Sequence, residues 1–188
     1  ATADLLGLSS LSILRVISEL KSVEGRFHVF QSADNITVVI DYAHTPDALY
    51  NVLSTINMIR TRNENLITVV GCGGNRDQEK RPIMGEKAVL LSDKVIFTSD
   101  NPRDEDPAII ISDMIKGVPP EHYKKAIKVT LREEAILRAG QLAKPGDIVL
   151  IAGKGHEKYQ EIKGKRNHFS DLETVSYTHL TLPTIVRV

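Results

Sequence analysis

Hydrophobic and polar positions follow two alternating patterns along the chain. Apolar residues at helical spacing predict helices at about 5–20, 46–61, 80–91, 107–116 and 130–142. Short β-rich apolar runs predict strands at 27–30, 36–40, 66–70, 94–98 and 147–152. The turn-like Ser32-Ala33-Asp34-Asn35 makes the first two runs a hairpin or paired edge strands. The later alternation of strands and helices predicts an α/β fold with a mainly parallel sheet covered by helices.

Composition narrows the class of protein. The 188 residues are 41% apolar and 26% charged, which suits one globular domain with extensions. Lys plus Arg and Asp plus Glu both number 24, so no net charge favours nucleic acid or an anionic membrane. A single cysteine excludes an internal disulfide, and no apolar run reaches the roughly 18–20 residues of a membrane span. We expect a cytoplasmic protein without nucleic-acid or membrane partners.

Two short strings that each follow a predicted strand hold the most suggestive polar side chains. They are Asp100-Asn101-Pro102-Arg103 and Gly153-Lys154-Gly155-His156-Glu157. The carboxyl ends of parallel strands open onto one crevice, so the two strings are predicted to form two walls of one site. Arg103 suits a ligand carboxylate, and Asp100 or Asn101 suits an ammonium. A plain turn explains the first string about as well, because Asn-Pro and Asp-rich strings are common in turns.

Two further loops follow predicted strands. After Asp41, Thr45 is placed to cap a helix that has Pro46 at its first position, which requires no function. Asp41 and His44 then remain as groups suited to ribose hydroxyls and phosphate, although a histidine is more often structural.

The glycine-rich loop at 71–74 offers backbone amides for an anion, but the chain has neither a P-loop nor a dinucleotide fingerprint. Its Cys72 is interpreted as a small buried residue rather than a nucleophile. The histidines and the cysteine show no metal-ligand spacing.

Together with Val23-Glu24-Gly25-Arg26, these strings resemble the Mur ligase family of cell-wall synthesis, specifically the C-terminal domain of its meso-diaminopimelate-adding members. The resembling stretches are DYAHTPDAL at 41–49, GCGGNRDQEKRP at 71–82, TSDNPRDEDP at 98–107 and AGKGHEKYQ at 152–160. They occur in order over most of the chain. The resemblance implies the Rossmann-like sheet of that domain.

The resemblance also implies an ATP-dependent amide ligase that adds meso-diaminopimelate to UDP-N-acetylmuramoyl-L-alanyl-D-glutamate in peptidoglycan synthesis. In this family the peptide carboxylate becomes an acyl phosphate, which the incoming amine attacks. Carried over by position, the amino-acid pocket comprises Arg76, Asp100, Asn101, Pro102, Arg103, Gly153 and Glu157. ATP is expected to touch Arg26, Asp41 and His44. Arg103 is the expected specificity residue, because meso-diaminopimelate has a second carboxylate that lysine lacks.

The family's P-loop, magnesium ligands and carbamylated lysine belong to a central domain that follows a UDP-binding domain. We expect residues 1–22 to be the end of the central ATPase domain or a linker helix, and 23–173 to be the C-terminal domain. Residues 174–188 leave the family pattern and are interpreted as an atypical tail of vector or misread origin. ATP, Mg²⁺ and the UDP-linked dipeptide are then bound mainly by the absent domains. The isolated chain is expected to be inactive, with no catalytic or metal-binding residue of its own.

Two other classes of function share part of these sequence features. A stand-alone amino-acid-binding module would use the same pocket without any role for ATP. A Rossmann-type oxidoreductase would share the alternating pattern, but the missing dinucleotide fingerprint disfavours it.

Overall fold

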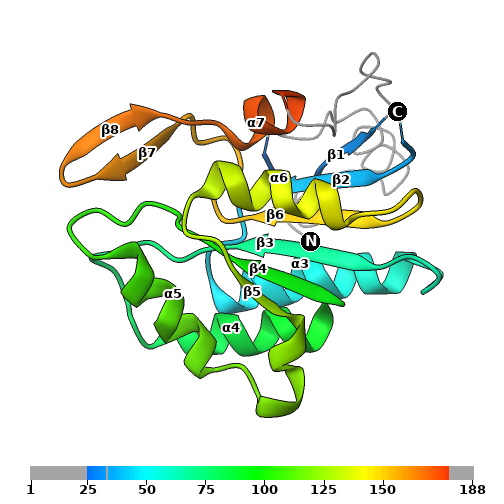
Figure 1. Cartoon of the computed structure of the whole chain (residues 1–188), viewed down its shortest axis with the longest axis horizontal. Coiled ribbons are helices and arrows are strands. Elements are labelled where there is room, and N and C mark those ends of the chain that lie inside the picture. The colour runs from blue at the N-terminus through cyan, green and yellow to red at the C-terminus, as the bar shows by residue number, and fades with distance from the viewer. Residues whose placement is uncertain (1–24, 33, 178–188) are drawn as a thin grey trace, which may run out of the picture.

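The computed structural model describes residues 25–32 and 34–177, which fold around one sheet (Figure 1). The sheet has the strand order β1-β2-β6-β3-β4-β5. Its strands are β1 (His28–Gln31), β2 (Thr37–Asp41), β3 (Leu66–Val70), β4 (Lys94–Phe97), β5 (Ala126–Lys128) and β6 (Ile148–Ala152). β1 is antiparallel to β2, and the other neighbours are parallel. The predicted mainly parallel sheet and the predicted pairing of the first two strands are both confirmed.

Helices cover both faces of this sheet. α3 (Pro46–Ile59), α4 (Lys80–Leu91) and α5 (Pro107–Lys116) pack on one face, and α6 (Arg132–Leu142) and α7 (Asp171–Tyr177) pack on the other. Figure 1 shows α6 crossing in front of the sheet and α3 and α4 behind it. The strands contribute side chains to the cores on both faces of the sheet, because successive side chains point to opposite faces. In β3, for example, Leu66 and Val70 join the first core while Ile67 and Val69 join the second.

Local capping fixes where two helices begin. Thr45 is the N-cap of α3, where its hydroxyl accepts a hydrogen bond from the Ala48 amide at 3.3 Å, and Pro46 follows it. Asp106 caps α5 in the same way, with Pro107 next and the Ala108 amide 2.8 Å from its carboxylate. Both caps satisfy an amide that has no partner within the helix. The cap predicted at Thr45 is therefore confirmed.

Several elements were not predicted from the sequence. They are the 3₁₀ helix η1 (Pro120–Lys125), the strand β5, the hairpin of β7 (Tyr159–Ile162) and β8 (Lys165–His168), and α7. The hairpin carries no alternating apolar face, since every residue of β8 is exposed. Among the described helices, none is long and apolar enough to cross a membrane.

Of the predicted domain boundaries, only the one after residue 173 falls within the described part of the chain. Residues 1–22 and 178–188 lie outside the described part of the chain. Helix α7 runs across the boundary placed after residue 173, and Val175 is buried in the core beneath it.

A buried ion pair joins α6, α7 and the end of β6. The Nε and Nη2 atoms of Arg132 donate to the two Asp171 oxygens at 2.7 and 2.8 Å, and Nη2 also donates to the Ala152 carbonyl at 3.0 Å. Both charged side chains are fully buried. Burial opposes the Arg132 charge, but the adjacent Asp171 outweighs it and raises the pKa of the guanidinium. This pair fixes the point at which the chain leaves β6.

We predict that Arg132→Met lowers the free energy of unfolding by about 3–5 kcal/mol, because it leaves Asp171 buried without a counter-charge. Urea denaturation of the whole chain measures this loss. Arg138→Met is the matched control, since Arg138 is exposed on the same helix and should change the value by less than about 0.5 kcal/mol. Equal losses in both variants would contradict a structural role for the pair.

Candidate functional site

The carboxyl ends of four neighbouring parallel strands fall in one row. Asp41 of β2 pairs in register with Ala152 of β6, Ala152 with Val70 of β3, and Val70 with Phe97 of β4. The loops that follow these four strands therefore leave the sheet at the same edge. The two strings singled out in the sequence do come together there.

Asn101 and Glu157 form the contact between the two predicted walls. Asn101 Nδ2 donates to Glu157 Oε2 at 2.9 Å, and Asn101 Oδ1 accepts the Glu161 amide at 2.9 Å. The Tyr42 hydroxyl, from the loop after β2, donates to Glu157 Oε1 at 3.4 Å. Asp100 and Asn101 are buried, and Glu157 is partly buried. The site thus presents carboxylate and amide oxygens on a fixed framework.

Lys154 lies completely buried beneath these groups. Its Nζ atom is 3.1 Å from Glu157 Oε2, 3.2 Å from Asn101 Oδ1 and 3.7 Å from Asp100 Oδ1. Burial alone would raise the pKa of Glu157, but the Asn101 amide and the Lys154 charge outweigh it and lower that pKa. Sequence reasoning gave Lys154 no role. The only signal for one was its position between two glycines at a strand exit.

Gly153 is required by the closeness of the two walls. Its φ is +118°, and a Cβ atom there would lie 2.9 Å from Asp100 Oδ2. A side chain at this position would therefore strain the backbone and displace the Asp100 carboxylate. The predicted place of Gly153 in the pocket has this physical basis.

The β7–β8 hairpin holds Arg103. The Arg103 amide donates to the Glu161 carbonyl at 3.0 Å, and the Lys163 amide donates to the Arg103 carbonyl at 2.7 Å. Arg103 Nη1 donates to the Gly74 carbonyl at 2.8 Å, and Nε lies 3.7 Å from Glu161 Oε2. The side chain is 20% exposed, so most of it is buried against this framework.

The loop after β3 packs against the loop after β4. The Gly74 amide donates to the Asn101 carbonyl at 2.9 Å, and a Cβ atom at Gly74 would lie 2.0 Å from the Pro102 carbonyl oxygen. Gly74 therefore serves close packing here. Arg76 is exposed next to Gly73, and the nearest atom to a Cβ at Gly73 is Arg103 Nη1, at 3.0 Å. The two predicted arginines thus flank one glycine.

Arg81, at the start of α4, ties these two loops together. Its Nη2 atom donates to both Glu105 oxygens at 2.9 and 2.8 Å, and its Nη1 atom donates to Asp113 of α5 at 3.0 Å. Glu105 also accepts a hydrogen bond from the Asn75 amide. Only 1% of the Arg81 side chain is exposed. Sequence reasoning placed this residue in the family string at 71–82 but gave it no role.

A hollow lies beside Tyr42, next to the contact between the two walls. It has a volume of about 240 Å³ and is lined by Arg26, Asp41, Tyr42, Ala43, His44 and Ala48. Asp41 Oδ2 accepts the Phe27 amide at 2.7 Å, and the Arg26 guanidinium lies 5.8 Å from the Tyr42 ring centre. The structure therefore gathers the three residues expected to touch ATP. Tyr42 forms a wall common to this hollow and to the Glu157 site.

Another hollow lies apart from the predicted site residues. This larger hollow, of about 500 Å³, lies between α3 and α4, where Asp47 and Lys87 pair with each other at 3.3 Å. It contains no predicted site residue, and its other charged group is Glu86. Within the described ranges, no group of three or more His, Cys, Asp or Glu side chains is arranged to hold a metal ion.

Comparison with known proteins gives a consistent family. Residues 25–155 match the family model described as Mur ligase, glutamate ligase domain. The chain is 51% identical over 173 residues to the UDP-N-acetylmuramoyl-L-alanyl-D-glutamate–2,6-diaminopimelate ligase of Bacteroides thetaiotaomicron, covering 92% of this chain and 36% of that enzyme. It is 53% identical over 171 residues to the enzyme of the same name from Cytophaga hutchinsonii, covering 91% and 35%. The chain therefore spans about a third of the length of these curated relatives.

Solved structures agree with the sequence relatives. A structure of a UDP-N-acetylmuramoyl-L-alanyl-D-glutamate–2,6-diaminopimelate ligase superposes with a TM-score of 0.74 at 42% identity, covering 93% of this chain and 35% of that one. A Mycobacterium tuberculosis folylpolyglutamate synthase shares the fold at 21% identity, with a TM-score of 0.60 over 80% of this chain and 34% of its own.

Cys72 is buried behind the site, as predicted. It is 2% exposed, and its Sγ atom lies 3.5 Å from Met84 Sδ. Burial raises the pKa of this thiol to about 12. Because the thiolate is the reactive form of cysteine, burial and this raised pKa both disfavour a nucleophilic role for Cys72.

We predict that the native chain resists a thiol reagent at pH 8, and that one thiol per chain reacts once guanidinium chloride unfolds it. The reason is that both burial and the raised pKa of Cys72 suppress the thiolate. The absorbance of the coloured thiolate that the reagent releases measures the extent of the reaction. Rapid stoichiometric labelling of the native chain would contradict the buried placement.

Proposed function

The chain belongs to the Mur ligase family, and on that basis we propose that it is the C-terminal domain of an ATP-dependent ligase joining meso-diaminopimelate to UDP-N-acetylmuramoyl-L-alanyl-D-glutamate. The observation that carries the proposal is the contact of Asp100–Arg103 with Gly153–Glu157 at the carboxyl edge of the sheet. The names of the relatives at about 50% identity support the same reaction. In this proposal, the domain binds the amino acid and presents its amine.

The charges in the pocket suit a diamino, dicarboxylic amino acid. Asp100 and Glu157 offer carboxylates to an ammonium, while Arg103 and Arg76 offer guanidinium groups to a carboxylate. Pro102 and Gly153 shape the wall between them. L-lysine lacks the second carboxylate and would leave one guanidinium group without its partner, which is the basis for rejecting it. Arg103 is the residue we assign to that choice.

The hollow beside Asp41 suits part of a nucleotide. Its volume of about 240 Å³ is below the roughly 300–1,000 Å³ of a complete small-molecule site. Asp41 would accept from ribose hydroxyls, and Arg26 and His44 would lie toward the phosphates. The chain spans about a third of the length of its curated relatives, so we assign Mg²⁺ and most of the ATP contacts to the other parts of such an enzyme. When bound, ATP supplies the phosphoryl group that activates the peptide carboxylate.

Positioning is the contribution that we propose for these residues. The lowered pKa of Glu157 makes it a weak base, so it is better suited to holding an ammonium than to removing its proton. Tyr42 lines the hollow beside Asp41 and also contacts Glu157, which would place the amino acid beside the nucleotide. An amine held in this way reacts faster because it does not have to be oriented from solution.

A chimaera tests the proposal. We would replace the matching third of the Bacteroides thetaiotaomicron ligase with residues 25–177 and measure ATP-dependent ligation of meso-diaminopimelate. We expect the chimaera to be active and the 188-residue chain alone to be inactive. A folded chimaera that binds the amino acid but cannot ligate it would favour the stand-alone binding module. Ligation by the chain alone would contradict the assignment of ATP binding to absent domains.

We predict that in this chimaera Arg103→Ala raises the KM for meso-diaminopimelate about 10- to 100-fold, the loss of one charge-assisted hydrogen bond. The KM for ATP should stay unchanged. Asp41→Asn is the matched variant in the hollow beside Asp41 and should raise the KM for ATP instead. Steady-state kinetics with each substrate varied in turn measure both constants. Equal effects of either variant on both substrates would refute the division into an amino-acid site and a nucleotide site.

A further inference from the structure

We propose that Lys154 is the positioning residue of the amino-acid pocket, a buried cation that orients Glu157 and Asn101 and keeps the Glu157 carboxylate ionised. This inference rests on the proposed function, because the amino-acid ligand comes from there. The contacts of Lys154 themselves are those of the chain without a ligand. Lys154 is not among the residues expected to touch the amino acid. It lies below them, and its effect on the ligand passes through Glu157 and Asn101.

The contacts of Lys154 leave its ammonium few other roles. All of the side chain is buried, and its acceptors within 3.2 Å are Glu157 Oε2 and Asn101 Oδ1. Asn101 Nδ2 donates to the same Glu157 oxygen, so the three side chains form a closed triangle. The Lys154 Nζ atom also lies over the Tyr159 ring, 5.5 Å from the centre of the ring. A ligand therefore cannot reach this cation without displacing its partners.

The groups facing Glu157 from each surrounding element determine its charge state. Tyr42 after β2 and Asn101 after β4 donate hydrogen bonds to it, and Lys154 after β6 adds a positive charge. Arg132 on α6 attracts both Glu157 and Asp100 through space. Asp100 opposes them as a second carboxylate in the same pocket. Lys154 is the cation that donates a hydrogen bond to Glu157. Without its charge, the carboxylates of Asp100 and Glu157 would lie in the same site without this counter-charge.

The contacts of Glu157 prepare it to bind an ammonium group. A carboxylate that is already ionised and held by two partners needs no rearrangement when an ammonium arrives, so less free energy is lost on binding. Removing Lys154 should raise the pKa of Glu157 and free its carboxylate to turn away from Asn101. The ammonium site would then be weakened, while the carboxylate site at Arg103 and Arg76, on the other loops, would be unchanged.

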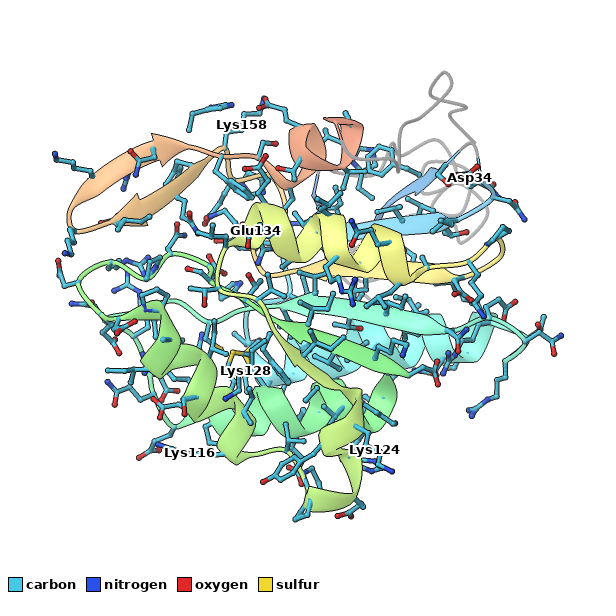
Figure 2. The ribbon with its side chains drawn as sticks, in the orientation of Figure 1. Asp34, Lys116, Lys124, Lys128, Glu134 and Lys158 are labelled. Carbon is cyan, nitrogen blue, oxygen red and sulfur yellow. The ribbon has the colours of Figure 1, made fainter. Side chains whose placement is uncertain are left out.

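The test is a ¹³C NMR titration of the Glu157 carboxyl in the whole 188-residue chain. Lys154→Met keeps the length and volume of the side chain and removes the charge. We expect its Glu157 pKa to be higher than in the unaltered chain by about 1–3 units. Lys158→Met is the matched control, because Lys158 is exposed four residues away at the outer edge of the molecule (Figure 2). A Glu157 pKa that is the same in Lys154→Met and in Lys158→Met would overturn the proposal.

A second measurement needs no variant and so does not depend on how well Lys154→Met folds. The buried ammonium of Lys154 should give a ¹H–¹⁵N signal protected from exchange, and this signal should shift as Glu157 titrates. A Lys154 ammonium that exchanges as fast as the surface lysines, or that ignores the titration of Glu157, would also overturn the proposal.

Titration of both proteins with meso-diaminopimelate separates this proposal from the proposed function. A raised Glu157 pKa with no ligand response in the unaltered chain would uphold the role of Lys154 and count against the amino-acid site. A ligand response of equal strength in the unaltered chain and in Lys154→Met would uphold the amino-acid site and overturn the positioning role.

Discussion

Everything at the candidate site depends on the common end point of four parallel strands. Because β2, β6, β3 and β4 stop at paired residues, their loops leave the sheet side by side. This places Asp41, Gly153, Gly71 and Thr98 at one edge, although they are spread over more than half of the sequence. The two buried cores on either side of the sheet hold this edge in place. Ligands of open α/β sheets bind in this position for the same reason.

Buried charge is the second organising feature. Lys154, Arg81 and Arg132 are all buried, and each is paired with at least one carboxylate. An unpaired charge at such depth would be strongly destabilising, so each cation fixes the position of its partners. Arg81 joins the loops that carry Arg76 and Arg103, and Arg132 fixes the end of β6. The exposed pocket residues therefore rest on a buried ionic framework.

The sequence predicted the central architecture well because apolar periodicity and capping residues are local signals. The runs at 66–70 and 147–152, and Thr45 with Pro46, correspond closely to β3, β6 and the start of α3. The hairpin β7–β8 was missed because its strands are polar and short, and it is held by backbone contacts with Arg103. Lys154 and Arg81 were missed for a related reason. Burial of a lysine or an arginine depends on distant partners, such as Asn101 or Glu105, that no local pattern reveals.

We propose that the site between the loops after β4 and β6 selects an amino acid with two carboxylates. An NMR titration of the isotope-labelled chain with meso-diaminopimelate and, separately, with L-lysine examines this selection. We expect resonance shifts concentrated at 100–103 and 153–157 with meso-diaminopimelate, and a much weaker response to L-lysine. An equal response to L-lysine, or shifts that map to the hollow between α3 and α4, would contradict it.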